Sequence, residues 1–234
     1  MRMRELSTRN IKSKPMAGEP ATLASAAYER LRREIIGGAF PPGRKLHIRR
    51  LCERYQMGLS PVCEALNRVS RDGLVRQNDL RGFSVAPMSL EDLTDLTLTR
   101  CWLNELALRQ AIARGDAAWE EGIVLAFHRF QRTSQGEPAH ENAHRQFHAS
   151  LIAACGAARL IAYCEQLFDA ADRYRNLKQP HQLQERRKQD EHRAIMDAVL
   201  ARDTEKAVAL MNAHLRGTER IASEALRRSH REKR

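Results

Sequence analysis

Residues 59–75 read LSPVCEALNRVSRDGLV, and this stretch decides the fold of the N-terminal part of the chain. Ser60 is a good helix N-cap, and Pro61 follows it at the first helical position, where its missing N–H costs nothing. The apolar residues that follow recur on one helix face, and Asp72-Gly73 ends the pattern. The stretch therefore predicts a short helix with a buried stripe, made by Val62, Ala65, Leu66 and Val69.

Two further helices are expected before this one. Apolar residues at helical spacing predict helices over 23–36 and 48–55. Pro41-Pro42-Gly43 lies between them and makes a stiff turn that cannot stay helical. Gly58 is the natural place for the tight reversal into the third helix.

Two short strands are expected after it. Residues 74–76 and 83–85 predict a β-hairpin that has Arg81 and Gly82 at its tip. Three helices and a basic hairpin make a winged helix-turn-helix over residues 21–88, and its third helix is short enough to enter a DNA major groove. The alternative is a three-helix module that is used for protein contacts.

The positive charge of the chain is concentrated at its N-terminal end. The 234 residues have a net charge of +11, and nine of these charges lie within the first 88 residues. Residues 1–20 are polar, basic and interrupted by proline and glycine, which predicts a disordered arm. A basic module joined to a nearly neutral remainder favours a partner such as DNA, although charge by itself also fits a basic surface that has no partner.

The remainder of the chain is predicted to be an all-helical domain over residues 89–228, with a basic tail at 229–234. Alanine and leucine are abundant and aromatic residues make up only 5%, which favours helix packing. The expected fold class is therefore mostly α, with a winged helix-turn-helix followed by an antiparallel bundle that has room for a ligand. The expected helices cover 90–114, 116–132, 138–155, 157–177, 181–201 and 203–226.

Composition argues against secreted and membrane proteins. The five cysteines are odd in number and form no Cys-x-x-Cys pair, so a disulfide framework is not expected. The N-terminus has no apolar signal segment, and no apolar run approaches the length of a membrane span. We therefore expect a cytoplasmic protein without a membrane partner.

Four of the nine histidines stand out by position. His144 and His148 are four residues apart, so they lie on one face of their predicted helix, while His192 and His214 lie on two other helices. Imidazole nitrogens that converge from rigid helices are good ligands for a divalent metal. The alternative is that these histidines are ordinary hydrogen-bonded residues that bind nothing.

The N-terminal module resembles the DNA-binding domain of the GntR family. In that family an arginine at the start of the second helix and residues that open the third helix contact DNA. The resemblance implies that Arg49, Ser60, Pro61, Asn67 and Arg68 face DNA, together with Arg81 and Gly82 of the wing. The stretches that match are Pro42-Gly43-x-x-Leu46, Leu51-x-Glu53-Arg54-Tyr55, Ser60-Pro61-Val62-x-Glu64-Ala65-Leu66-Asn67-Arg68, Asp72-Gly73-Leu74-Val75 and Arg81-Gly82-Phe83-x-Val85.

Two positions depart from the family pattern. Leu59 and Cys63 stand where family members often have arginine. Because arginine reads guanine with two hydrogen bonds, their absence implies an operator sequence that differs from the usual family type. The contacts to phosphate, which dominate affinity, are not affected.

The C-terminal part resembles the helical FCD domain that accompanies this winged helix in many GntR regulators. The resemblance implies that the four histidines bind a divalent metal, often zinc, which helps to hold a carboxylate effector. His144 replaces the usual aspartate, which makes the site more positive and favours an anionic effector. The stretches that match are His144-Arg145-Gln146-Phe147-His148, His192-Arg193-Ala194-Ile195 and His214-Leu215.

Arg100 matches an arginine that in this family often reaches the effector cavity. The alternative for Arg100 is a solvated arginine on a helix surface. The segments 59–61, 99–102 and 115–120 are also similar to the group of the carbon-starvation regulator CsiR.

Two other functions compete with the regulator hypothesis. A zinc hydrolase also has His-x-x-x-His on a helix, but its first histidine is followed by a glutamate that acts as general base. Here that residue is Arg145, which cannot accept a proton. A purely structural bundle remains the second alternative. The preferred hypothesis is a homodimeric repressor that binds a palindromic operator and is controlled by a small organic acid.

Overall fold

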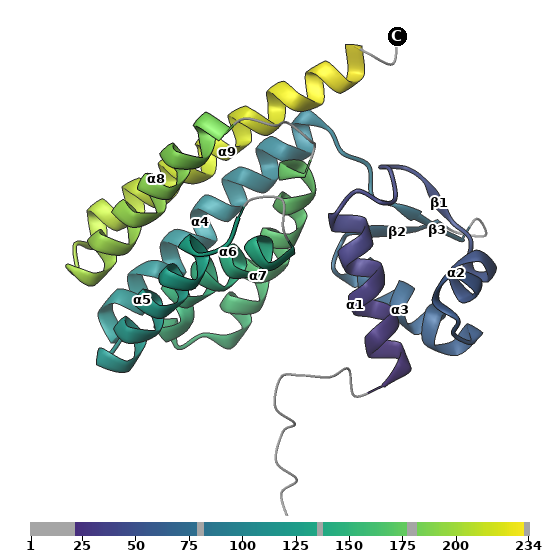
Figure 1. The fold of residues 1–234 in the computed structure, drawn as a ribbon, viewed down its shortest axis with the longest axis horizontal. Helices are drawn as coiled ribbons and strands as arrows, with labels where there is room; N and C mark the ends of the chain where they lie inside the picture. Colours follow the sequence, from purple (N-terminus) through teal and green to yellow (C-terminus); the bar gives the residue numbers. More distant parts are fainter. Residues whose placement is uncertain (1–21, 79–81, 135–137, 177–181, 232–234) are drawn as a thin grey trace, which may run out of the picture.

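The computed structural model describes residues 22–78, 82–134, 138–176 and 182–231. The arm expected at 1–20 and the wing residue Arg81 lie outside the described residues. The described chain is mostly helical, as expected. Figure 1 shows a winged module and a helical bundle, which meet where α1 packs against α7.

The N-terminal module has the three expected helices. Its core contains the predicted stripe of the third helix, whose four residues are all buried, together with Leu31 and Leu74. The α1 cap is Thr22, whose hydroxyl accepts the N–H of Ser25. The elements are α1 (Leu23–Ile36), β1 (Lys45–Leu46), α2 (Ile48–Tyr55), α3 (Leu59–Arg71), β2 (Val75–Asn78) and β3 (Gly82–Val85).

The wing is a three-stranded antiparallel sheet in the order β1-β3-β2, where the sequence predicted only a hairpin. Lys45 lies opposite Ser84, and Val75 lies opposite Val85. The third strand was missed because two residues are too few to show an alternating pattern. The turn that leads into β1 has a positive φ of 77° at Gly43, a conformation that glycine adopts without strain.

The start of α3 corrects the sequence prediction. Gly58 is the N-cap in extended conformation, so the helix begins at Leu59, and Ser60 is not the cap. Pro61 is accommodated at the third position because the first-turn N–H groups have no acceptor within the helix. Gly58 also does not supply the reversal: the residue with positive φ between α2 and α3 is Gln56, at 54°.

In the described residues, the C-terminal part is a bundle of six helices with one short 3-10 turn. Its core includes Leu108, Ile123, Phe147, Ile195 and Met211. The helix α4 lies between α7 and α9 and runs antiparallel to α9, since Thr94 bonds to Glu219 and Arg109 to Glu205. The elements are α4 (Leu90–Arg114), α5 (Ala117–Gln131), α6 (Pro138–Ile152), η1 (Ala153–Cys155), α7 (Ala158–Arg175), α8 (Gln182–Leu200) and α9 (Thr204–Arg231).

The predicted helix boundaries were correct to within a few residues. The largest difference is at the C-terminus, where α9 continues to Arg231 and so includes residues expected in a basic tail. Of the described helices, none has the length and apolar character that crossing a bilayer requires.

Candidate metal centre and DNA-facing surface

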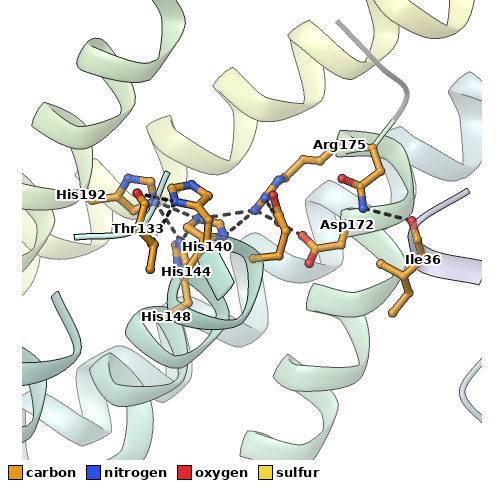
Figure 2. Close-up of polar contacts among 10 residues, drawn as sticks. Ile36, Thr133, His140, His144, His148, Asp172, Arg175 and His192 are labelled. Atoms are coloured by element: carbon orange, nitrogen blue, oxygen red, sulfur yellow. Dashed lines mark hydrogen bonds and ion pairs between the residues drawn. The ribbon is translucent and has the colours of Figure 1, made fainter. Parts of the chain in front are cut away.

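The four singled-out histidines meet inside the bundle. His144 and His148 come from α6, His192 from α8 and His214 from α9, and all four are buried. The Nε2 atoms of His144, His148 and His192 lie 3.0–3.2 Å from one another. Figure 2 shows these three rings converging. The helical bundle thus brings together residues that are up to 70 positions apart in the sequence.

Hydrogen bonds cannot satisfy all three Nε2 atoms at once. Each Nε2 either has a proton and donates or lacks one and accepts. With three atoms and two states, at least one pair must consist of two donors or two acceptors, which repel. A metal ion at 2.0–2.1 Å from each nitrogen holds its tetrahedral ligands roughly 3.3 Å apart, close to the spacing in the structure. The residues present therefore fit a divalent metal.

The surroundings of His144, His148 and His214 favour the neutral imidazole, which is the form that binds metal. Burial lowers the pKa of His144, His148 and His214, and neighbouring cationic groups lower those of His144 and His148 further. Aromatic rings line the centre: the Phe130 centroid lies 5.0 Å from that of His192, and Phe168 lies 5.4 Å from His144. These rings exclude water and strengthen electrostatic interactions within the site.

Two of the candidate metal ligands, His214 and His144, have a neighbouring side chain at Nδ1, and the two neighbours have opposite effects on metal binding by Nε2. Glu191 lies 3.0 Å from Nδ1 of His214, which leaves Nε2 of that ring free to bind a metal. Arg175 contacts Nδ1 of His144, and a guanidinium can only donate. Neutral His144 then has its proton on Nε2, so this ring must give up the Arg175 contact before Nε2 can bind a metal. His144 is the least prepared of the four ligands.

Arg175 also blocks a second potential metal site beside the histidines. Glu141, His144 and Asp172 lie close enough together to hold an ion. However, the Arg175 guanidinium is bonded to Glu141 and lies 3.2 Å from Asp172, so a cation already occupies that position (Figure 2). Burial raises the pKa of Asp172, and Arg175 opposes that shift.

Arg100 is buried in the bundle rather than solvated. Its Nε is one of two buried side-chain nitrogen or oxygen atoms that lack a hydrogen-bond partner among the described residues. Burial lowers its pKa to about 10, and Asp172 opposes that shift, so the guanidinium stays charged at neutral pH. Its guanidinium carbon lies 5.7 Å from the centroid of the Phe168 ring, and that ring contacts both His144 and His148, so Arg100 lies close to the metal candidates. A buried, incompletely paired guanidinium is suited to an anionic ligand.

Most of the predicted DNA-contacting residues that the structure describes are exposed or half-buried, but one of them, Arg68, is engaged in contacts within the protein. Arg49 at the start of α2 and Ser60 and Asn67 on α3 are exposed, and Pro61 is half-buried. Gly82 begins β3 with a φ of 77°. Arg68 differs, because its guanidinium stacks 4.1 Å from the Tyr28 ring of α1 and donates to Ser25. This contact ties α3 to α1.

The exposed face of α3 contains two residues that the sequence analysis did not single out. Glu64 and Arg71 are exposed and share the helical spacing of Ser60 and Asn67. The departures Leu59 and Cys63 lie beside this face, and Leu59 is exposed. The α3 periodicity alone would have identified the set Ser60, Glu64, Asn67 and Arg71.

Two family models cover both parts of the chain. Residues 23–85 match the model of bacterial regulatory proteins of the gntR family, and residues 95–217 match the FCD domain. The chain belongs to the GntR family. It is a helix-turn-helix transcription regulator with an FCD domain, and not an enzyme. GntR regulators bind DNA operators, and FCD domains bind metal ions and small-molecule effectors.

Similar proteins support this assignment. The regulator BphR of Paraburkholderia xenovorans, whose function is uncharacterized, is 38% identical over 203 residues, which cover 83% of this chain and 82% of BphR. The transcriptional repressor GlaR of Escherichia coli is 33% identical over 200 residues, covering 80% and 90%.

Solved structures share the fold of this GntR regulator. McbR/YncC of E. coli superposes with a TM-score of 0.76 at 18% identity and covers 87% of this chain and 98% of its own. A GntR family member from Pseudomonas syringae gives 0.54 at 23% identity, over 91% and 89% of the two chains. The hydrolase alternative is excluded by the family, and Arg145 is ion-paired with Asp169.

Proposed function

We propose that this GntR regulator acts as a homodimeric repressor, and that a small organic acid bound beside a divalent metal in the bundle releases it from a palindromic operator. The observation that carries the proposal is the convergence of four buried histidines next to buried Arg100. The repressor assignment is supported by the name of the relative GlaR. DNA binding and the five free cysteines, three of them buried, support a place in the cytoplasm.

The DNA-binding role rests on α2, α3 and the wing. α3 has 13 residues and presents a polar face that can enter the major groove, with Ser60 and Asn67 directed outward. Arg49 is placed to bind phosphate, and the family resemblance assigns Arg81 and Gly82 of the wing to the DNA-binding surface. On the exposed face the Glu64 carboxylate can accept a hydrogen bond from the amino group of cytosine, and Arg71 can bind phosphate or guanine.

The metal role rests on His148, His192 and His214, with His144 as the fourth ligand. Neutral imidazoles leave the charge of a divalent cation uncompensated, so a bound zinc ion would supply an electropositive centre to which a carboxylate can bind. Arg100, which lies against the same Phe168 ring that contacts His148, provides a second positive group nearby. This pair explains how the site selects an organic acid over a neutral molecule of similar size.

Helix α7 connects this site with the DNA-binding module. One of its faces has Phe168, Asp172 and Arg175, which contact the histidines or their neighbours. The adjacent face holds the winged module by polar contacts: Gln166 donates to the carbonyl of Arg71, Arg173 to that of Ala86 and Asn176 to that of Ile36. These carbonyls lie at the ends of α3, β3 and α1, so a movement of α7 moves the DNA-facing surface.

Asp169 is the most direct link between the two regions. Its buried carboxylate pairs with Arg32 of α1 and with Arg145 of α6, the residue next to His144. An effector that displaces α6 or α7 changes the relative strength of the two ion pairs that Asp169 makes with Arg32 and Arg145. A coupling of about 1–3 kcal/mol between effector and DNA is enough to change operator occupancy several-fold or more.

A thermal-shift screen of organic acids, run with and without a metal chelator, tests the sensor role. We expect chelation alone to lower the melting temperature, and selected acids to raise it only in the metal-loaded protein. Binding to duplex DNA of the operator region, measured at several salt concentrations, tests the regulator role. A protein that binds DNA with salt dependence but responds to neither chelator nor acids would have a purely structural bundle.

A further inference from the structure

The first half of α3 has an apolar side chain on its outer surface. Leu59 is 63% exposed, and Cys63 and Asn67 follow it at intervals of four residues, the first half-buried and the second exposed. This spacing places the three side chains on one line along the helix. Single exposed leucines are common, so the position of Leu59 and the charges around it decide whether it has a role.

The start of α3 lies far from the bundle. Gln166 of α7 donates to the carbonyl of Arg71, which holds the C-terminal end of α3 against the bundle. Leu59 precedes Arg71 by twelve residues, which is about 18 Å along a helix axis. In helix-turn-helix proteins the N-terminal residues of the corresponding helix contact the edges of the bases. Leu59 is therefore among the residues that meet the bases when α3 enters the major groove.

The first half of α3 has no positive charge, whereas the neighbouring elements do. Residues 59–67 read LSPVCEALN, in which Glu64 is the one charged residue. Arg49 and Arg50 of α2 and Lys45 of β1 are exposed. These cations are suited to phosphate, and contacts to phosphate set the position of a protein on DNA without reading its sequence. The surface that remains for the base edges is largely uncharged.

An exposed leucine at the base edges favours one base. Thymine presents a methyl group in the major groove, whereas guanine presents two hydrogen-bond acceptors there. Leu59 has no donor to offer, so the guanine acceptors would lose their water without gaining a partner. The Glu64 carboxylate is itself an acceptor and repels the same guanine atoms. Thymine is the base whose groove edge includes an apolar group that Leu59 can cover.

We propose that Leu59 reads a thymine in each operator half-site by covering its 5-methyl group, and that Cys63 extends this apolar contact toward the next base pair. The inference rests on the proposed function, since α3 must enter the major groove, and it adds which base the helix selects. Leu59 and Cys63 are about 6 Å apart along the helix, which corresponds to about two base-pair steps of roughly 3.4 Å. Leu59 is then a specificity-determining residue, while the surrounding cations supply affinity.

Removal of single methyl groups from the DNA tests the contact. The full-length protein first selects its preferred duplexes from a random pool. Each thymine of the selected sequence is then replaced in turn by uracil, which lacks only the methyl group. We expect one thymine per half-site whose replacement weakens binding about fourfold, the factor that corresponds to about 0.8 kcal/mol for one buried carbon group. If no thymine responds, the proposal is overturned.

Leu59→Ala shows whether Leu59 makes this contact. In this variant the change from the responding thymine to uracil should alter binding less than twofold, because the leucine methyl groups that cover the thymine are gone. Leu125→Ala is the matched control, since Leu125 is 49% exposed on α5, and it should keep the fourfold difference. Both variants should melt at the wild-type temperature, because both side chains are exposed. An equal loss in the wild type and in Leu59→Ala overturns the proposal, since another residue then contacts the methyl group.

Leu59→Arg tests the same position by a change of preference. An arginine there can donate two hydrogen bonds to O6 and N7 of guanine, so the variant should select guanine in place of the responding thymine. Sequencing of the enriched duplexes, compared with those of the wild type, measures this. Selection of the wild-type sequence by Leu59→Arg overturns the proposal.

The outcomes separate this inference from the proposed function. A protein that selects a palindrome with salt-dependent affinity, but tolerates uracil at every thymine, loses the Leu59 contact and keeps its role as a regulator. A protein that enriches no sequence from the pool overturns both.

Discussion

The two functional regions of this GntR regulator differ in where their important side chains point. Arg49, Ser60 and Asn67 are exposed on the winged module. His192, by contrast, is 1% exposed, and its three partner histidines are also buried. In the proposed function, the exposed surface binds a large external partner, DNA. The histidine centre is assembled by folding, and its proposed partners are an ion and a small molecule.

The same difference applies to the cost of substitution. An exposed side chain can be removed with little change in stability, so its loss affects binding alone. A buried one leaves a cavity or an unpaired polar group, and its loss affects both stability and ligand binding. The following variants test this contrast, from the largest expected effect to the smallest.

His192→Ala should abolish stoichiometric metal binding. The ring supplies one of three converging Nε2 atoms, and loss of a direct ligand should weaken metal binding by more than the roughly 10–100-fold typical of supporting residues. Metal analysis of the purified protein measures the effect. His128→Ala, at an exposed position on α5, is the matched control. Metal retained at one equivalent in His192→Ala would remove the four-histidine site. His144→Ala should lose less affinity, because Arg175 already engages that ring.

Asp169→Asn should weaken the coupling between the histidine centre and the DNA-binding module, while metal binding and DNA binding both persist. The amide keeps the shape of the side chain but loses the charge that attracts Arg32 and Arg145. We expect metal binding to persist while the effector changes DNA affinity at least about fivefold less than in the wild type. Fluorescence anisotropy with and without effector measures this. Glu121→Gln, an exposed carboxylate on α5, is the control. An unchanged effector response would show that the signal takes another route.

Arg49→Ala should weaken operator binding by several-fold while leaving the melting temperature unchanged. One lost phosphate contact lowers affinity and reduces the slope of log affinity against log salt by about 1. The titration is carried out at three or more salt concentrations. Arg227→Ala removes the same charge from an exposed position near the end of α9 and should leave the slope as it is. Equal slopes for the two variants would contradict the placement of Arg49 at the DNA.

Ser60→Ala should change the free energy of unfolding by less than about 0.5 kcal/mol. The structure has Gly58 as the α3 cap, so the Ser60 hydroxyl contributes nothing to helix stability. Ser89→Ala is the comparison, because the Ser89 hydroxyl accepts the Asp92 N–H at 3.0 Å and should contribute about 1 kcal/mol. Urea unfolding of both variants decides between them. If Ser60→Ala loses as much free energy of unfolding as Ser89→Ala, Ser60 is the N-cap of α3, as the sequence predicted.

The sequence by itself determined the helices, the module types and the identity of the histidine set. Each of these depends on local signals, namely the spacing of apolar residues, cap and turn residues, and short motifs. The buried stripe of α3 and the helix α4 were predicted with the residues that the structure shows. The missed strand β1 and the wrong cap at Ser60 are errors of one or a few residues at element ends, where several local choices have similar energy.

Only the tertiary structure decided which side chains from different helices contact one another. It showed that Arg68 packs on Tyr28, that Asp169 joins Arg32 to Arg145, and that Arg175 engages His144. Asp169 and Asp172 of α7 are buried members of this network, and the sequence analysis did not single them out. Periodicity shows which face of a helix is buried, but it does not show which residue of another helix lies against it. That depends on the packing of all the helices together.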